Sequence, residues 1–263
     1  MPRQNVDNIE MNYELFGEGE PLVFIHGLGS SLRDWEPQRA FFAENYQILL
    51  FDVRGHGHSG KPKGPYTVKQ FAQDLAGLID SLSISSAHIV GISMGGMIAF
   101  QLAVIRPELV KSLVIVNSGP ELLVRTFKER FSIWQRFLIV RLLGMRKMGE
   151  VLSPRLFPKS EHAEIRQTFV QRWSENDPRA YRSAMAALVN WSVADSLDTI
   201  SCPTLFIASD QDYTPVALKE KYAARMPNAE LTVIEDAHHA VTTERPEAFN
   251  AVLADFLRQN SVQ

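Results

Sequence analysis

The chain contains Gly91-Ile92-Ser93-Met94-Gly95-Gly96, a stretch in which a serine lies between two glycines. The apolar run before it, residues 87–90, is typical of a buried strand, and residues 97–105 after it are typical of a helix. A serine at such a strand–turn–helix junction forms a nucleophile elbow, whose tight turn requires small neighbours and lifts the hydroxyl out of the sheet. Backbone N–H groups at the start of the following helix face the same space, which suits a developing oxyanion.

The composition is that of a globular enzyme. The 263 residues, 45% of them hydrophobic and 22% charged, suffice for one large domain or for a domain with an insertion. A net charge of −3 gives no reason to expect nucleic acid or an anionic membrane as a partner. The single cysteine, Cys202, excludes an intrachain disulfide and fits a reducing compartment, and residues 1–8 contain no apolar signal segment. We therefore expect a cytoplasmic protein without a membrane helix.

Apolar strands alternate with helical periods along most of the chain. The predicted strands cover residues 9–16, 22–25, 47–51, 87–90, 110–116, 204–208 and 231–234. The predicted helices in the same regions cover residues 68–82, 97–105, 216–226 and 246–257. This alternation favours an α/β fold with a mostly parallel, doubly wound sheet that is covered on both faces.

Residues 119–200 interrupt the alternation, because they contain helical periods over 122–143, 163–173 and 178–191 but no clear strand. The segment is also cationic, with 13 Lys or Arg and nine Asp or Glu between residues 120 and 200, a balance of about +4. These cations indicate either a solvated helix face or a field that steers an anionic substrate. We predict a core domain formed by residues 1–118 and 201–263, with residues 119–200 inserted as a helical cap.

Candidate catalytic residues follow four of the predicted strands. These strand ends carry His26-Gly27-Leu28-Gly29, residues 52–59, Ser209-Asp210-Gln211-Asp212 and Asp236-Ala237-His238-His239. In open α/β sheets, ligands lie beyond the carboxyl ends of the strands. A serine nucleophile needs a base within hydrogen-bond reach and a carboxylate that orients the base. The chain order Ser93, Asp212, His239 is the order expected for an elbow enzyme.

The chain resembles the α/β-hydrolase superfamily, in the capped branch of serine esterases and enol-lactonases. The resemblance covers about residues 9–257. It depends on His26-Gly27, Asp52-x-Arg54-Gly55-x-Gly57-x-Ser59, the elbow, Asp212 before Pro215, and His239 before Glu244-Arg245-Pro246. It implies that Ser93 attacks an acyl carbonyl, that His239 takes and returns the proton, and that Asp212 holds the imidazolium. It also implies an oxyanion hole formed by the backbone N–H groups of Leu28 and Met94.

The acid has an alternative in Asp210. The family spacing from the proline that opens the strand, here Pro203, favours Asp212. Only two residues separate Asp212 from Pro215, however, where the family usually has three. Some relatives carry the acid after the preceding strand, where this chain has Asn117 or Ser118, and neither is a carboxylate.

The base has an alternative in His238, although the spacing to Glu244-x-Pro246 favours His239. Neither this histidine pair nor His56-Gly57-His58 is accompanied by a spaced carboxylate or cysteine set, so we expect no metal and no cofactor. The resemblance makes residues 52–59 a structural loop, and His26 a residue that orders the oxyanion loop. Candidate residues of the substrate pocket are His26, Gly27, Trp134, Trp191 and His238.

The family comparison also narrows the reaction. Ser93 argues against epoxide hydrolases and haloalkane dehalogenases, whose nucleophile is an aspartate. Ile92 and Ala240 replace the asparagine and tryptophan usual in carbon–carbon hydrolases, which disfavours that chemistry. We therefore expect hydrolysis of a small-molecule carboxylic ester, thioester or lactone, with an enol-lactonase as the alternative and perhydrolysis as a side activity. A lyase or a ligand receptor on the same fold remains open, and the sequence specifies neither the acyl and alcohol groups nor the oligomeric state.

Overall fold

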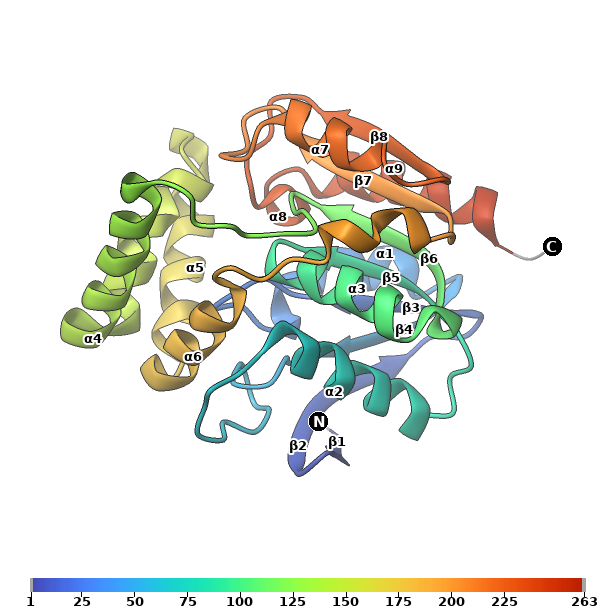
Figure 1. The fold of residues 1–263 in the computed structure, drawn as a ribbon, viewed down its shortest axis with the longest axis horizontal. Helices are drawn as coiled ribbons and strands as arrows, with labels where there is room; N and C mark the ends of the chain where they lie inside the picture. Colours follow the sequence, from blue (N-terminus) through green and yellow to red (C-terminus); the bar gives the residue numbers. More distant parts are fainter. Residues whose placement is uncertain (1, 262–263) are drawn as a thin grey trace.

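The computed structural model describes residues 2–261, in which eight strands form a sheet flanked by helices (Figure 1). The strand order is β1-β2-β4-β3-β5-β6-β7-β8. The strands are β1 (Arg3–Val6), β2 (Ile9–Phe16), β3 (Glu20–Ile25), β4 (Tyr46–Phe51), β5 (Ala87–Ile92), β6 (Val110–Val116), β7 (Thr204–Ser209) and β8 (Ala229–Ile234). Strand β2 pairs antiparallel with β1 and with β4, and the pairs from β4 to β8 are parallel. The prediction of a mostly parallel α/β sheet is confirmed.

The helices fall into a group around the sheet and a group between β6 and β7. Those around the sheet are α1 (Glu36–Phe42), α2 (Val68–Ser81), α3 (Met94–Ile105), α7 (Val216–Ala223), α8 (Val241–Glu244) and α9 (Pro246–Asn260). Those between β6 and β7 are α4 (Phe127–Leu156), α5 (Ala163–Ser174) and α6 (Pro178–Leu188). Short 3₁₀ helices are η1 (Leu32–Trp35), η2 (Pro107–Leu109), η3 (Ser160–His162) and η4 (Ala194–Thr199). The sequence pattern did not predict β1, α1 or α8, because each is too short for a clear period.

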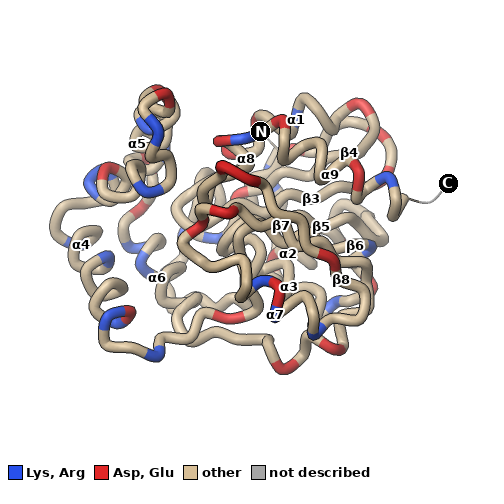
Figure 2. The backbone as a smooth tube through the Cα atoms, turned by 90° about the horizontal axis from the view of Figure 1, so that it is seen from above, with Lys and Arg blue, Asp and Glu red and all other residues tan. Residues whose placement is uncertain are grey.

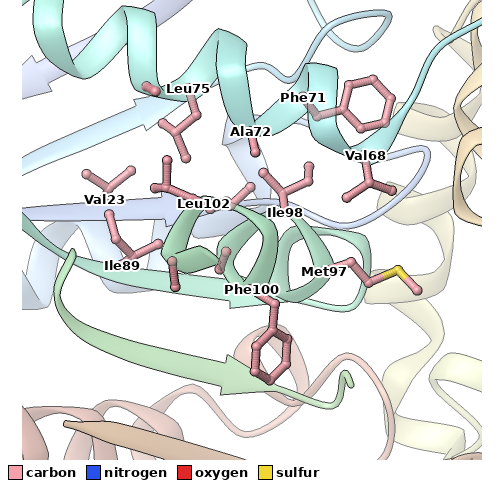
Figure 3. Close-up of a cluster of buried hydrophobic side chains, with 14 of the residues drawn as sticks. Val23, Val68, Phe71, Ala72, Leu75, Ile89, Met97, Ile98, Phe100 and Leu102 are labelled. Atoms are coloured by element: carbon pink, nitrogen blue, oxygen red, sulfur yellow. The ribbon is translucent and has the colours of Figure 1, made fainter. Parts of the chain in front are cut away.

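Both faces of the sheet are buried, because successive side chains of a strand point to opposite faces. In β3, Val23 and Ile25 belong to one buried cluster, whereas Leu22 and Phe24 belong to the other. Helices α2 and α3 contribute to the first cluster, and α1, α8 and α9 contribute to the second. Figure 3 shows the side chains of α2 directed at α3 and the sheet. Ten of the twelve residues of α3 are buried, which agrees with its almost entirely apolar sequence.

Helices α4, α5 and α6 lie together at one end of the sheet, opposite the C-terminal end of the chain (Figure 1). They belong to residues 119–200, which we call the helical segment. The segment has its own buried cluster, which consists of Val140, Met145, Met148, Trp173, Tyr181 and Met185. Helix α4 begins five residues later than predicted, because Thr126 and Glu129 form a capping box there. It continues beyond the predicted end through a break at Gly144, whose φ of 79° suits glycine.

Lys and Arg residues are distributed along α4, α5 and α6 (Figure 2). In residues 2–261, no helix is both long and apolar enough to cross a membrane. Cys202 is a free, partly buried thiol. The cytoplasmic location and the division into core and cap stay predictions.

Candidate active site

Ser93 lies at the junction of β5 and α3 in a backbone conformation that non-glycine residues rarely adopt, with φ 55° and ψ −118°. The turn is possible because its neighbours lack side chains. A Cβ added at Gly91 would lie 2.3 Å from the carbonyl oxygen of Gly95, and one added at Gly95 would lie 2.1 Å from that of Ile25. The Ser118 hydroxyl supports the turn by donating a 2.6 Å hydrogen bond to the Ser93 carbonyl.

His239 and Asp212 form a hydrogen-bonded pair, with 2.8 Å between Nδ1 and Oδ1. They come from the loops that follow β8 and β7, as the strand-end pattern predicts. Because an ionised carboxylate only accepts hydrogen bonds, the Nδ1 of His239 carries the proton and its Nε2 is an acceptor. The Asp212 side chain is fully buried, so its orientation is tightly held.

The two alternatives have other partners. Asp210 accepts a hydrogen bond of 3.0 Å from the Ala237 N–H and is exposed, which makes it an anchor between two loops. His238 directs its Nδ1 at Glu244, 2.8 Å away, and its backbone N–H donates to the same carboxylate at 2.6 Å. The pairing of His239 with Asp212 is therefore the one that our sequence assignment expects.

Lys219 on α7 is an unexpected neighbour of Asp212. Its side chain is 2% exposed, and its Nζ lies 2.7 Å from Asp212 Oδ2. The same ammonium donates two 2.8 Å bonds to the backbone and side-chain oxygens of Thr214, whose hydroxyl also donates to Asp212. Desolvation alone would raise the pKa of Asp212, but the bond from His239, with those from Lys219 and Thr214, lowers that pKa to about 2. Asp212 is thus ionised throughout the physiological range.

Tyr213 lies between the predicted nucleophile and the predicted base. Its hydroxyl is 2.6 Å from the Nε2 of His239, and the two rings stack with centroids 4.1 Å apart. The Ser93 side chain is a further neighbour of this hydroxyl and lowers its pKa. The Tyr213 side chain as a whole is largely exposed to solvent. Desolvation by the protein around its hydroxyl and the charge of Asp212 raise the pKa of Tyr213, so this hydroxyl is a proton donor to His239.

The loop after β3 lies against Ser93, as expected for an oxyanion loop. A Cβ added at Gly27 would be 3.6 Å from the Cβ of Ser93. Leu28 follows and packs both on the core cluster and on the cluster of the helical segment. Gly29 has φ 77°, and a Cβ there would meet the Trp173 ring at 2.7 Å. The loop therefore lies between Ser93 on one side and the helical segment on the other.

His26 supports this loop from below. Its Nε2 accepts a 3.0 Å hydrogen bond from the Val53 N–H, and its Nδ1 therefore donates the 2.8 Å bond to the Gly27 carbonyl. The side chain is fully buried, and desolvation lowers the pKa of His26. Both ring nitrogens are engaged with the backbone, which agrees with a residue that orders the loop, and a place for His26 in the pocket stays a prediction.

The remaining pocket candidates lie in different surroundings. Trp191 donates a 2.9 Å hydrogen bond from Nε1 to Gln101 and packs on the core. Trp134 is 54% exposed and stacks with Phe131, at 5.7 Å between ring centroids. Trp191 is thus held by the core, and a place for Trp134 on the pocket wall stays a prediction.

The loop of residues 52–59 is held by hydrogen bonds within the loop and to neighbouring segments. Asp52 accepts from the N–H groups of Leu32 at 2.9 Å and His58 at 2.8 Å. Arg54 forms a buried bidentate pair with Asp74, at 2.5 and 2.6 Å. These contacts agree with a structural interpretation of the loop.

Asn117, which directly follows β6, connects the end of β7 with the loop that carries His239. Its side chain donates to the Ser209 hydroxyl at 2.7 Å and to the His239 carbonyl at 3.0 Å, and it accepts from the Ser209 N–H at 2.9 Å. Asn117, which stands where some relatives have the acid, thus holds the loop of the predicted base, His239.

A family profile for the alpha/beta hydrolase fold matches residues 20–246. The chain belongs to the α/β-hydrolase family. Known proteins align with nearly all of it. The 3-oxoadipate enol-lactonase 2 of Acinetobacter baylyi is 32% identical over 250 residues, 92% of this chain and 91% of that protein. A putative carbamate hydrolase of Caulobacter sp. is 30% identical over 244 residues, 90% of each chain.

Among solved structures, the enol-lactonase from Burkholderia xenovorans LB400 has a TM-score of 0.91 at 27% identity, and the match covers 98% of this chain and 100% of that one. This α/β hydrolase is therefore similar to hydrolases of different substrates, and hydrolysis is the function that the similarity supports.

Tyr213 and Lys219 were not predicted as parts of the hydrolase site. The shortened spacing between Asp212 and Pro215 was the available signal for Tyr213, because one residue fewer changes where that side chain points. Lys219 gave no signal, since a lysine on a short helix is usually solvated.

Proposed function

We propose that this α/β hydrolase is a serine enzyme that cleaves carboxylic esters, thioesters or lactones through an acyl-enzyme intermediate. The observation that carries the proposal is the 2.8 Å bond between His239 and Asp212, next to a serine held at φ 55° on an elbow. The Tyr213 hydroxyl lies 2.6 Å from His239 Nε2 and has the Ser93 side chain as a further neighbour, which supports a place for base and nucleophile around one small group.

In the proposed reaction, the Ser93 hydroxyl attacks the carbonyl carbon while His239 Nε2 takes its proton. The N–H groups of Leu28 and Met94 donate to the oxyanion, and Asp212 stabilises the imidazolium. Collapse breaks the bond to the leaving oxygen or sulfur, which takes the proton from His239. A water then attacks the acyl-enzyme with His239 as its base, so that the acid is released and Ser93 regains its proton.

Lactone hydrolysis is the second candidate, and the similarity to two enol-lactonases favours it. The chemistry is the same, except that the leaving oxygen stays attached to the acyl group. We also propose that residues 119–200 act as a cap. The contacts between Gly29 and Trp173, and between Gly55 and Ala180, support this role because they seat the helical segment on the loops around Ser93.

The test is a substrate panel of p-nitrophenyl esters from acetate to octanoate, simple lactones, an enol-lactone and a carbamate. Ser93→Ala should reduce kcat by about 10⁴-fold or more, and a fluorophosphonate should add its mass to Ser93. If wild type cleaves no member of the panel, and Ser93→Ala binds ligands as wild type does, a ligand receptor replaces the hydrolase. Rapid enol-lactone opening with negligible ester cleavage would select the second candidate.

The acid assignment has a matched pair of variants. Asp212→Asn should lower kcat by about 10⁴-fold, the effect of the equivalent change in the serine-protease example. Asp210→Asn, two residues away, should cost less than about 10-fold because this carboxylate bonds only backbone and lies outside the His239 pair. Larger damage from Asp210→Asn would overturn the assignment.

A further inference from the structure

Helix α7 buries a lysine and exposes a leucine, which reverses the usual preference of these residue types. Lys219 is 2% exposed, whereas Leu218, the preceding residue, is 39% exposed. Lys219 shares the buried face of the helix with Tyr222 and Ala223, at the i, i+3, i+4 spacing of one helix face. Burying an ammonium costs free energy unless its donors are satisfied and its charge is compensated. The partners of Lys219 therefore explain why the helix is turned this way.

The ammonium of Lys219 uses all three of its donors. Its Nζ lies 2.7 Å from Asp212 Oδ2, and 2.8 Å from both the backbone oxygen and the hydroxyl oxygen of Thr214. The Thr214 hydroxyl donates in turn to Asp212 Oδ2. The Asp212 side chain is fully buried, so water screens this ion pair little.

The two oxygens of the Asp212 carboxylate serve different partners. Oδ2 accepts from Lys219 and Thr214, whereas Oδ1 lies 2.8 Å from the Nδ1 of His239. The torsion that turns a carboxylate is soft and has no sharp minimum of its own. The two bonds on Oδ2 therefore fix the orientation in which Oδ1 faces the imidazole.

Lys219 also holds the loop that carries Tyr213. Its bonds to Thr214 fix the residue that directly follows this tyrosine. The Tyr213 ring stacks on His239, and its hydroxyl lies 2.6 Å from the Nε2 of that histidine. Residues 212–214 thus bond both ring nitrogens of His239, and one buried cation of α7 holds them in place.

The segments around His239 carry further charged and titratable groups, each with a partner of its own. They are Glu244 of α8 with His238 and with His162 of η3, Asp236 with Lys159 and Arg245, Asp210 with the Ala237 N–H, and Arg136 of α4 with the Tyr181 hydroxyl. Within residues 2–261, Lys219 is the cation that bonds the carboxylate paired with His239.

We propose that Lys219 is a positioning residue of the hydrolase, which holds Asp212 toward His239 and extends activity to lower pH. The inference rests on the proposed function, in which Asp212 orients the base. The ammonium partly compensates the charge of Asp212, so it opposes protonation of the neighbouring imidazole. Activity that needs a neutral His239 should therefore persist to a lower pH than it would without Lys219.

The kinetic test records kcat/KM from about pH 4 to pH 9 with the ester of the panel that wild type cleaves fastest. Lys219→Met removes the charge at a similar side-chain length. It should move the midpoint of the acid limb upward by about 0.5–1.5 pH units. It should also lower the plateau of kcat/KM about 10- to 100-fold, because Asp212 loses a partner that orients it.

Two further variants separate the charge from the packing. Lys219→Arg keeps the charge, so its midpoint should stay at that of wild type even where the larger side chain lowers the rate. Lys219→Gln keeps a donor without the charge and should shift the midpoint as Lys219→Met does, which preserves the test if the methionine variant does not fold. Lys221→Met is the matched control, because it removes an exposed charge from the same helix and should change neither quantity.

A measurement without substrate distinguishes this inference from the proposed function. In protein with ¹⁵N-labelled histidine, NMR follows the titration of the His239 ring, and the signal is assigned by its loss in His239→Gln. Lys219→Met should move that titration upward as it moves the acid limb. If no ester or lactone is hydrolysed but this shift is found, the serine-hydrolase proposal fails and the role of Lys219 in the pair stands.

Two results would overturn the role of Lys219. The first is hydrolysis with an unchanged midpoint in Lys219→Met and Lys219→Gln, whatever the loss of rate, because the lysine would then only support packing. The second is an equal shift in Lys219→Arg and Lys219→Met, because the charge would then not be its cause.

Discussion

Tyr213 illustrates how one residue is placed by the length of its loop. Two residues separate Asp212 from Pro215, and the first of them, Tyr213, stacks on His239 with ring centroids 4.1 Å apart. Its hydroxyl bonds the same nitrogen of His239 that must accept the proton of Ser93. The resting site therefore contains a bond that has to break before the proposed reaction begins.

Tyr213→Phe keeps the stacked ring and removes only this bond. A neutral hydrogen bond contributes about 0.5–1.5 kcal/mol, so we expect kcat/KM for a small ester to rise about two- to tenfold at neutral pH. Steady-state kinetics of the variant beside wild type checks this, and Tyr222→Phe, whose hydroxyl bonds Glu121, serves as a control. A loss of 100-fold or more would show that Tyr213 conducts the proton between Ser93 and His239 instead of competing for it.

At the scale of one element, the first turn of α3 has a low helix propensity but is required for tight packing against the sheet. Glycine is among the poorest helix formers, yet α3 begins with Met94 followed by Gly95 and Gly96. The reason lies outside the helix, because a side chain at Gly95 would meet the backbone of β3 and one at Gly96 would meet Ser118. Helix α3 can approach the sheet closely only without these side chains, and this approach sets the position of Ser93.

The same substitution at two helical glycines separates these effects. Gly95→Ala should reduce the free energy of unfolding by at least about 2 kcal/mol, because its Cβ would lie 2.1 Å from a backbone oxygen. Gly77→Ala in α2 meets only the end of the Val6 side chain, so it should change stability by less than about 1 kcal/mol, with a gain from helix propensity. Urea unfolding of both variants measures the difference; equal effects would mean that the close approach does not control stability.

Across the whole molecule, stability in acid depends on buried histidines. His56 is fully buried, its Nδ1 bonds the Arg54 carbonyl at 3.1 Å, and its Nε2 has no partner within residues 2–261. Desolvation, with the nearby His26, lowers the pKa of His56 from 6.5 to about 3. In the unfolded chain, His56 is protonated below about pH 6.5, whereas in the folded chain it stays neutral down to about pH 3. The unfolded state therefore binds more protons in this window, and the free energy of unfolding falls as the pH drops through it.

Replacing His56 should weaken that dependence. Between pH 7 and pH 4, we expect His56→Gln to lose less unfolding free energy than wild type, by about 2–3 kcal/mol, even if it starts from a lower value. His58→Gln, in the same loop but exposed, should follow the wild-type slope. Urea unfolding at four pH values measures how the free energy of unfolding depends on pH. The same pH dependence for His56→Gln and wild type would show that His56 does not cause the loss of stability in acid.

Much of this molecule was predictable because its signals are local. The strands at residues 9–16 and 110–116 agree with β2 and β6. The first has a roughly alternating pattern, and the second is a mostly apolar run that is buried on both faces of the sheet. The proximity of Asp212 and His239 was also predictable, because parallel strands end at the same edge. The bounds of α4 were predicted less well. Its start depends on the capping box of Thr126 and Glu129, and its continuation depends on the break at Gly144.

The sequence by itself determined the mostly parallel sheet, the serine elbow and the chain order of the predicted nucleophile, acid and base, because periods, turns and strand ends are properties of neighbouring residues. Only the tertiary structure decided that Lys219 bonds Asp212 and that the Tyr213 hydroxyl bonds the Nε2 of His239. Each of these depends on side chains that different segments bring together, and their pairing follows from how α7 and the strand-end loops pack. Charge and hydrogen-bond partners are set by that packing, because they depend on the distances between side chains that lie far apart in the sequence.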